Sequence, residues 1–255
     1  MTAIPTHRAA PPTDRIRVWD LPTRIFHWTL AGLLLVCWLT GEDEGAGLIH
    51  RLSGEAIAGL IVFRIIWGFV GGEHARFANF LKGPRAAASH LGHLLRGRAE
   101  PTTGHNPLGG LSVLLLLASV SFVVVTGLFS AGDEGPGGPL AGRFGWELSG
   151  LHEPAFRILQ GVVALHLMGV VVTSIVSRDN LVAAMITGSK QRRPDAAPAP
   201  PRRGSTVALL LAFVLAASAS AYLMSLPHSS SGGAGVQTPG HAGAGTPDAD
   251  EQNES

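Results

Sequence analysis

The chain has 255 residues, of which 46% are hydrophobic and only 15% are charged, and its formal net charge is +1. The apolar residues are clustered in long runs rather than spread periodically, which argues against an ordinary soluble domain. A single cysteine, Cys37, excludes an intrachain disulfide, a CxxCH haem-attachment motif and an iron–sulfur cluster held by this chain alone.

Residues 1–20 are polar and proline-rich, and we expect a flexible arm that is not a signal peptide. Apolar runs then follow at about 25–41, 48–72, 108–130, 154–177 and 205–226. A helix of about 20 apolar residues crosses the hydrocarbon core, and in lipid only such helices satisfy their own backbone groups. The sequence therefore predicts an all-α integral membrane protein: a four-helix transmembrane bundle within 21–188, plus a fifth C-terminal transmembrane helix.

The segments between and after these runs have distinct compositions. Residues 84–97 are basic and suit a short interfacial helix, and residues 189–204 form a Pro/Arg linker. The run at 205–226 contains no ionisable residue, so we expect an added anchor outside the four-helix body. Residues 227–255 contain few apolar residues and are predicted to be disordered.

Basic residues predict the orientation in the membrane. If the chain crosses the membrane five times, residues 1–24, 73–107 and 178–204 lie on the same side as the N-terminus. These segments hold fifteen of the nineteen Lys and Arg residues. The acidic stretches at 41–45 and 132–135 fall on the opposite side. The positive-inside rule then places the N-terminus in the cytoplasm and the C-terminus in the periplasm of a bacterial inner membrane. Because the basic residues flank spans, nothing favours nucleic-acid binding.

Four of the eleven histidines stand at or inside predicted spans: His27, His50, His152 and His166. His152 and His166 are 14 residues apart, so they share a helix face and lie about 21 Å apart along the axis. His27 and His166 then lie at the cytoplasmic depth, and His50 and His152 at the outer depth. The other histidines, including His90 and His93, are expected to be solvated, with a ligand pair at 90 and 93 as the less favoured alternative.

Two facing histidines at each of two depths are what two stacked b-type haems require. A single intramembrane histidine is more often hydrogen-bonded than metal-bound, but the matched depths favour ligation. A proton relay or a bound metal ion is the alternative, although the carboxylates that such sites usually add are missing. Glu55 is the nearest carboxylate, and we expect it at the outer interface.

Arg64 follows His50 by 14 residues and so reaches the cytoplasmic depth on the same face. A guanidinium there needs an anion, and a haem propionate would supply one. Arg24, three residues before His27, would assist. Ala31, Gly54 and Gly169 stand one turn from ligands and would let a flat porphyrin approach the backbone.

Several motifs resemble the bacterial cytochrome b561 family, including the b-type cytochrome subunits of nickel–iron hydrogenases. They are RIFHW (24–28), HRLSGEAIAG (50–59), FRIIWGFVGGEHARFANF (63–80), GHNPLGG (104–110), LHE (151–153), LHLMGV (165–170) and NLVAAMITG (180–188). The resemblance covers about residues 15–190 and omits the fifth span. It implies that His27 pairs with His166, and His50 with His152, around two haems b.

The resemblance also implies electron transfer between quinone and a redox partner. We therefore expect a membrane di-haem cytochrome that carries electrons between the quinone pool and a redox centre on the periplasmic side or in a partner subunit, with a cytochrome c or a hydrogenase-like subunit as the partner. Trp67, with Arg64 and Arg24, would then help to line a quinone pocket near the cytoplasmic haem. The alternatives are the anchor subunit of a hydrogenase-like complex, a superoxide:quinone oxidoreductase and a haem-free transporter.

Overall fold

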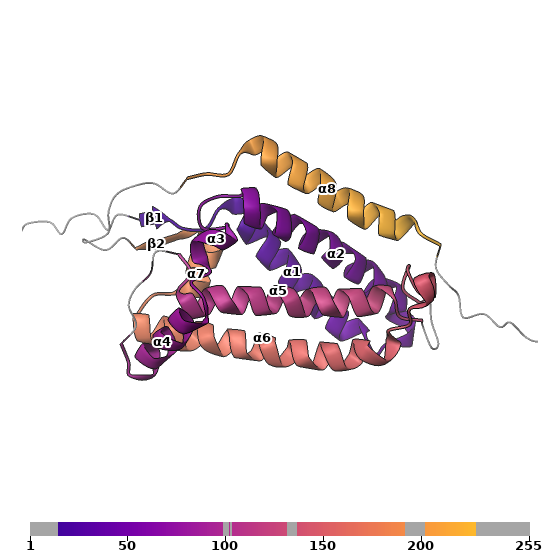
Figure 1. Ribbon diagram of the computed structural model, residues 1–255, viewed down its shortest axis with the longest axis horizontal. Helices are drawn as coiled ribbons and strands as arrows, with labels where there is room; N and C mark the ends of the chain where they lie inside the picture. Colours follow the sequence, from indigo (N-terminus) through magenta and orange to yellow (C-terminus); the bar gives the residue numbers. More distant parts are fainter. Residues whose placement is uncertain (1–14, 99–101, 103, 132–136, 192–201, 228–255) are drawn as a thin grey trace, which may run out of the picture.

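The computed structural model describes residues 15–98, 102, 104–131, 137–191 and 202–227. Five helices are long and apolar enough to cross a membrane: α1 (Leu21–Thr40), α2 (Gly47–Val70), α5 (Pro107–Leu128), α6 (Ser149–Ser177) and α8 (Thr206–Ser225). The prediction that these five apolar runs form helices is confirmed. In Figure 1 these helices run along the long axis of the molecule, and the short elements gather mainly at one end.

Local sequence explains where the spans begin. Asp20 caps α1 by accepting a hydrogen bond from the backbone N–H of Thr23 (2.9 Å), and a proline follows within the first turn. Asn106 caps α5 in the same way through the N–H of Gly109 (2.6 Å), again with a proline next in the chain. The first turn of each helix is therefore specified by the residues that precede the apolar run.

Helix α6 differs from its predicted start. It begins at Ser149, five residues before the expected 154, and includes Pro154. A proline in the first turns of a helix removes few hydrogen bonds, because the N–H groups there have few partners to lose. The earlier start places His152 within α6 rather than before it.

Helix α2 lies at the centre of the packing. It packs against α1, α5 and α8, while α5 packs against α6. One apolar cluster joins Cys37, Ile57, Ile61, Val120 and Leu159 from α1, α2, α5 and α6. Cys37 is a free cysteine and is buried there. A second cluster joins α2 to α8 through Phe63, Trp67, Ala212 and Ala216.

The end that holds the basic segments is built from small elements. They are β1 (Arg15–Arg17), α3 (Phe77–Phe80), α4 (Pro84–Leu95), α7 (Leu181–Thr187) and β2 (Ser189–Gln191). Helix α4 falls where the sequence predicts an interfacial helix, and it packs against α5. Two 3-10 turns, Glu44–Ala46 and Arg143–Gly145, lie in the loops at the other end.

Two predicted irregular segments contribute to a small sheet. Strand β1, from the expected flexible arm, pairs antiparallel with β2, from the expected linker, in the register Arg15↔Gln191. Backbone pairing of this kind needs no apolar pattern, so hydropathy gave no sign of it. Residues 1–14, the linker residues 192–201 and the tail from 228 onward lie outside the described residues.

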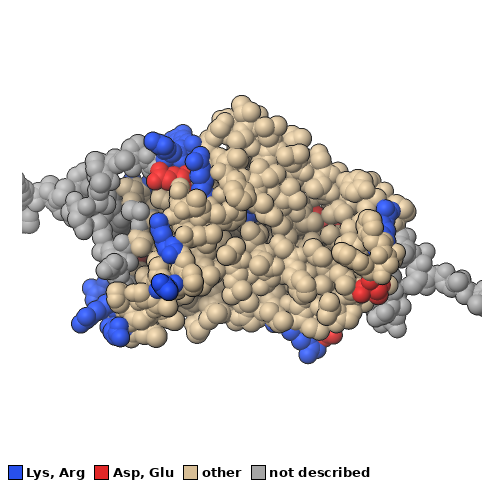
Figure 2. Space-filling view, viewed as in Figure 1, with Lys and Arg blue, Asp and Glu red and all other residues tan. Residues whose placement is uncertain are grey.

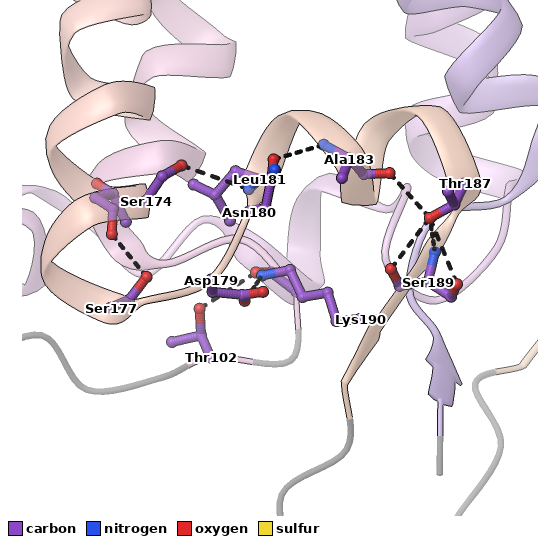
Figure 3. A network of polar contacts seen from close by, with 12 residues as sticks. Thr102, Ser174, Ser177, Asp179, Asn180, Leu181, Ala183, Thr187, Ser189 and Lys190 are labelled. Atoms are coloured by element: carbon purple, nitrogen blue, oxygen red, sulfur yellow. Dashed lines mark hydrogen bonds and ion pairs between the residues drawn. The ribbon is translucent and has the colours of Figure 1, made fainter. Parts of the chain in front are cut away.

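A polar network fixes the elbow between α6 and α7 (Figure 3). Asn180 caps α7 by accepting from the N–H of Ala183 (2.8 Å), and Ser174 accepts from the N–H of Leu181 (3.4 Å). The ammonium of Lys190 lies 3.0 Å from Asp179, and its side chain is buried. These contacts connect β2 to the end of α6 and so hold the small sheet against the helices.

Candidate functional site

The outer histidine pair is brought together by α2 and α6. The ring centroids of His50 and His152 are 6.1 Å apart, with the ring planes at 86° to each other. An iron bonded to two imidazole nitrogens at about 2 Å each holds the ring centres about 6 Å apart. At this spacing, His50 and His152 would be able to hold one haem iron between them.

Hydrogen bonds fix the orientation of both outer rings. The Nδ1 atom of His50 lies 3.0 Å from the carbonyl oxygen of Cys37 in α1. The Nδ1 atom of His152 lies 3.1 Å from the carbonyl oxygen of Val123 and 3.1 Å from the hydroxyl of Thr126, both in α5. An imidazole that donates its Nδ1–H to a carbonyl presents its Nε2 lone pair to a metal. Each ring thus has one nitrogen held by the protein and the other available to a metal.

Glycines adjoin both rings, and sequence reasoning missed them. A Cβ atom on Gly127 would lie 2.8 Å from Cε1 of His152, and one on Gly41 would lie 3.6 Å from Cε1 of His50. The glycines singled out from the sequence behave differently: a Cβ on Gly54 or Gly169 would meet nothing within 4 Å. The open space at Gly54 and Gly169, one helical turn from His50 and His166, agrees with the close approach of a flat macrocycle.

The inner pair consists of His27 of α1 and His166 of α6. The two imidazoles lie within electrostatic range of each other. Nδ1 of His166 lies 3.3 Å from the hydroxyl of Ser112 in α5. Nδ1 of His27 is buried and has no hydrogen-bond partner among the described residues. Donor chemistry and placement fit a second bis-imidazole site.

Arg64 is buried, with 3% of its surface exposed. Its Nη1 donates to the carbonyl oxygen of Ala75 (3.2 Å), and its guanidinium lies 4.7 Å from the centroid of the Phe77 ring. Arg24 donates from Nη2 to the carbonyl oxygen of Ile186 at the end of α7. Both side chains therefore lie at the same end as His27 and His166 and already have partners from the protein.

Trp67 packs toward α8 and the start of α1. Its indole N–H donates to Asp20 (3.2 Å), and its ring packs in the cluster that joins α2 to α8. The structure thus brings Trp67 together with the helix cap of α1 and the start of α8, and not with a histidine pair.

His105 is a residue of this end that the sequence analysis assigned to solvent. Its ring lies between Trp19, at 4.5 Å, and Phe80, at 4.6 Å between centroids, and its Nδ1 is buried without a hydrogen-bond partner among the described residues. Burial, then the positive charge of Arg64, lowers the pKa of His105 to about 3. The available signal was its place just before the Asn106 cap, where side chains commonly pack back onto the helix.

His74 and the two histidines of α4 complete the set at this end. The His74 ring lies 6.4 Å from that of Trp19, and burial is the main cause that lowers its pKa. His90 is buried against α5, contrary to the expectation of a solvated side chain, whereas His93 is exposed. Among the described residues, no group of three or more potential ligands lies together in the manner of a protein-held metal ion.

Comparison with known proteins gives the family. The family model described as "Prokaryotic cytochrome b561" matches residues 18–188. A protein named "Probable Ni/Fe-hydrogenase B-type cytochrome subunit" from Rhizobium leguminosarum bv. viciae is 26% identical over 218 residues, covering 69% of this chain and 88% of its own length. A protein of the same name from Azotobacter chroococcum mcd 1 is 29% identical over 220 residues, covering 71% and 91%.

No solved structure matches the chain. The matched residues include all four histidines and exclude α8. The five spans agree with a multi-pass protein of the bacterial inner membrane, and a b-type cytochrome carries haem b. This chain belongs to the prokaryotic cytochrome b561 family and is a membrane cytochrome of the b type.

Proposed function

We propose that this protein binds two b haems, one through His50 and His152 and one through His27 and His166, and carries electrons across the membrane. The observation that carries the proposal is the outer pair, with 6.1 Å between ring centroids and with both Nδ1 atoms held by the protein. Bound haem supplies one-electron chemistry at its iron. The polypeptide supplies the ligands, their orientation and an apolar surrounding.

The residues between the two pairs support this division of work. Ile57, Ile61, Val120 and Leu159 are buried between the two histidine levels and exclude water there. A dry, low-dielectric layer limits the reorganisation that accompanies each change of charge at the sites. The protein thus keeps the two centres separate and places both in an apolar environment.

Pyridine haemochrome analysis of the purified chain tests the proposal directly. We expect two b haems per chain. Replacing His152 by alanine should remove one haem and leave the other, and replacing His166 should remove the other one. A colourless protein after expression with ample haem, or full pigment in both variants, would refute the assignment.

We also place a quinone pocket at the inner end, where α3, α7 and the small sheet lie. Arg64, Arg24 and the buried imidazole of His105 gather there, close to the inner pair. A neutral imidazole can exchange hydrogen bonds with a quinone, and guanidinium groups bind anionic oxygen atoms such as those of haem propionates. If Arg64→Ala left both haem potentials and quinone turnover unchanged, its role at this end would be wrong.

The partner we favour is a hydrogenase-like oxidoreductase, because the relatives are named as Ni/Fe-hydrogenase cytochrome subunits. Co-purification of a metalloenzyme in mild detergent supports this partner. Reduction of a soluble cytochrome c by the chain alone favours the cytochrome partner. Quinone-dependent consumption of superoxide by the chain alone favours the third alternative, in which superoxide itself is oxidised at the outer site.

Charge distribution supports a cytoplasmic N-terminus. Figure 2 shows Lys and Arg side chains gathered mainly at the end that holds α4 and the small sheet. The basic end faces the cytoplasm under the positive-inside rule. A reporter enzyme that folds only in the periplasm, fused after α8, should be active; activity only when it is fused after α6 would reverse the topology.

A further inference from the structure

A charge pair lies within α2 on the outer half of the membrane domain. The Nε atom of Arg51 is 3.6 Å from Oε1 of Glu55, one helical turn later, and their side chains are only 13% and 1% exposed. The sequence analysis placed Glu55 at the outer interface, whereas the structure buries it. A buried ion pair is costly to desolvate and adds little stability, so its presence calls for another role.

Helix α8 packs along α2 (Figure 1). The hydroxyl of Ser220 donates to the backbone carbonyl of Glu55 (3.1 Å). A Cβ atom on Gly59 would lie 2.1 Å from that hydroxyl oxygen and 2.7 Å from the carbonyl oxygen of Ala216. Only a glycine permits so close an approach, and small residues are the usual means by which membrane helices pack tightly.

The beginning of α8 is fixed as well. The backbone N–H of Glu73 donates to the carbonyl oxygen of Arg202 (2.9 Å), and the N–H of Arg202 donates to the carboxylate of Glu73 (3.0 Å). Helix α8 is thus held at both ends against α2. The fifth span, expected outside the four-helix body, instead packs closely along α2 and contacts the backbone of Glu55.

The pair is close to the outer histidines along the chain. Arg51 adjoins His50 in the sequence. Glu55 follows His50 by five residues and so lies about 7.5 Å from it along the helix axis, at 1.5 Å per residue. In a medium of low dielectric constant, a charge at this range acts strongly on a neighbouring centre, whereas water would screen it.

We infer that the buried charges of Arg51 and Glu55 act with opposite sign on the electrostatic potential at the His50–His152 site, so that each of them separately shifts the reduction potential of the haem bound there. The inference rests on the proposed ligation. The carboxylate favours the ferric form of that centre and the guanidinium favours the ferrous form, so the two side chains act with opposite sign.

Redox titration of the purified chain, followed in the α-band, tests this inference. Glu55→Gln should raise the potential of one of the two haems, Arg51→Gln should lower the potential of the same haem, and the double variant should return close to the parent. Glu55→Asp retains the charge and should leave the potential near that of the parent.

Glu153 provides a matched control, because it adjoins His152 and pairs with Arg157 but is 70% exposed. Glu153→Gln should shift the potential much less than Glu55→Gln. Shifts of the same sign in the Glu55 and Arg51 variants, or no shift in either, would overturn the inference while leaving the haem proposal intact. Absence of a haem spectrum in the parent would instead refute the proposed function, and this inference with it.

Discussion

Substitution of Gly127 by alanine probes the outer site without replacing either of its proposed ligands, His50 and His152. The added methyl carbon would lie 2.8 Å from Cε1, 3.2 Å from Nδ1 and 3.6 Å from Nε2 of His152. The first distance is well inside van der Waals contact, so the ring must move. Its movement is opposed by the hydrogen-bond contacts of Nδ1 with Val123 and Thr126.

The expected cost follows from these contacts. Overpacking of one methyl group costs about 1–3 kcal/mol, and a lost hydrogen bond costs about 1 kcal/mol. If the His152 ring tilts to avoid the methyl group, the cost of the lost hydrogen bond replaces part of the cost of overpacking. A loss of about 1–3 kcal/mol weakens binding by a factor of about 5–150, at 1.4 kcal/mol per tenfold change.

Haem release to an excess of apomyoglobin measures this loss. We expect one of the two haems to leave the Gly127→Ala variant faster than it leaves the parent, while the other is released at the parental rate. Gly161→Ala in α6 is the matched control, because a Cβ there would meet nothing within 4 Å. Equal release from both variants would refute the close contact between Gly127 and a ligating His152.

Three further predictions concern residues around the sites. His105 has a pKa lowered to about 3 from 6.5, so the unfolded chain binds more protons than the folded chain between these values. Stability should therefore fall as pH drops below about 6.5, by up to about 1.4 kcal/mol per pH unit, and His105→Gln should flatten this dependence in chemical unfolding experiments. Asp20→Ala should lower the free energy of unfolding by about 1–2 kcal/mol, because it removes the cap of α1 and the acceptor of the Trp67 indole; an unchanged unfolding midpoint would contradict this role. Thr126→Val should weaken the outer site alone, by about 1 kcal/mol, since it removes the hydroxyl that lies 3.1 Å from Nδ1 of His152; haem titration of the apoprotein measures this change.

The apolar helices and the spacing of the histidines along them could be predicted because both depend on simple lengths. A fixed bilayer thickness determines how long an apolar run must be, and a fixed rise per residue determines how deep His152 and His166 lie. The apolar runs therefore located five helices, although not their ends to the residue. The start of α6 was missed because only Leu151 is apolar among residues 149–153, while the backbone there is already helical.

Lateral contacts could not be predicted in the same way. Lipid and protein are equally apolar, so hydropathy does not say which side of a helix meets another helix. The packing of α8 on α2 depends on Gly59 and Ser220, two small residues that carry no hydropathy signal. The burial of His105 depends on Trp19 and Phe80, which are distant from it in sequence.

The pairing of β1 with β2 has a consequence for how this chain is assembled from parts. The two strands bring residue 15 beside residue 191, so the family domain begins and ends at one place on the basic side. A unit whose termini meet can receive an extension at either end without rearrangement of its interior. Genetic fusion, circular permutation or acquisition of another helix at this junction would leave the paths of α1, α2, α5 and α6 unchanged.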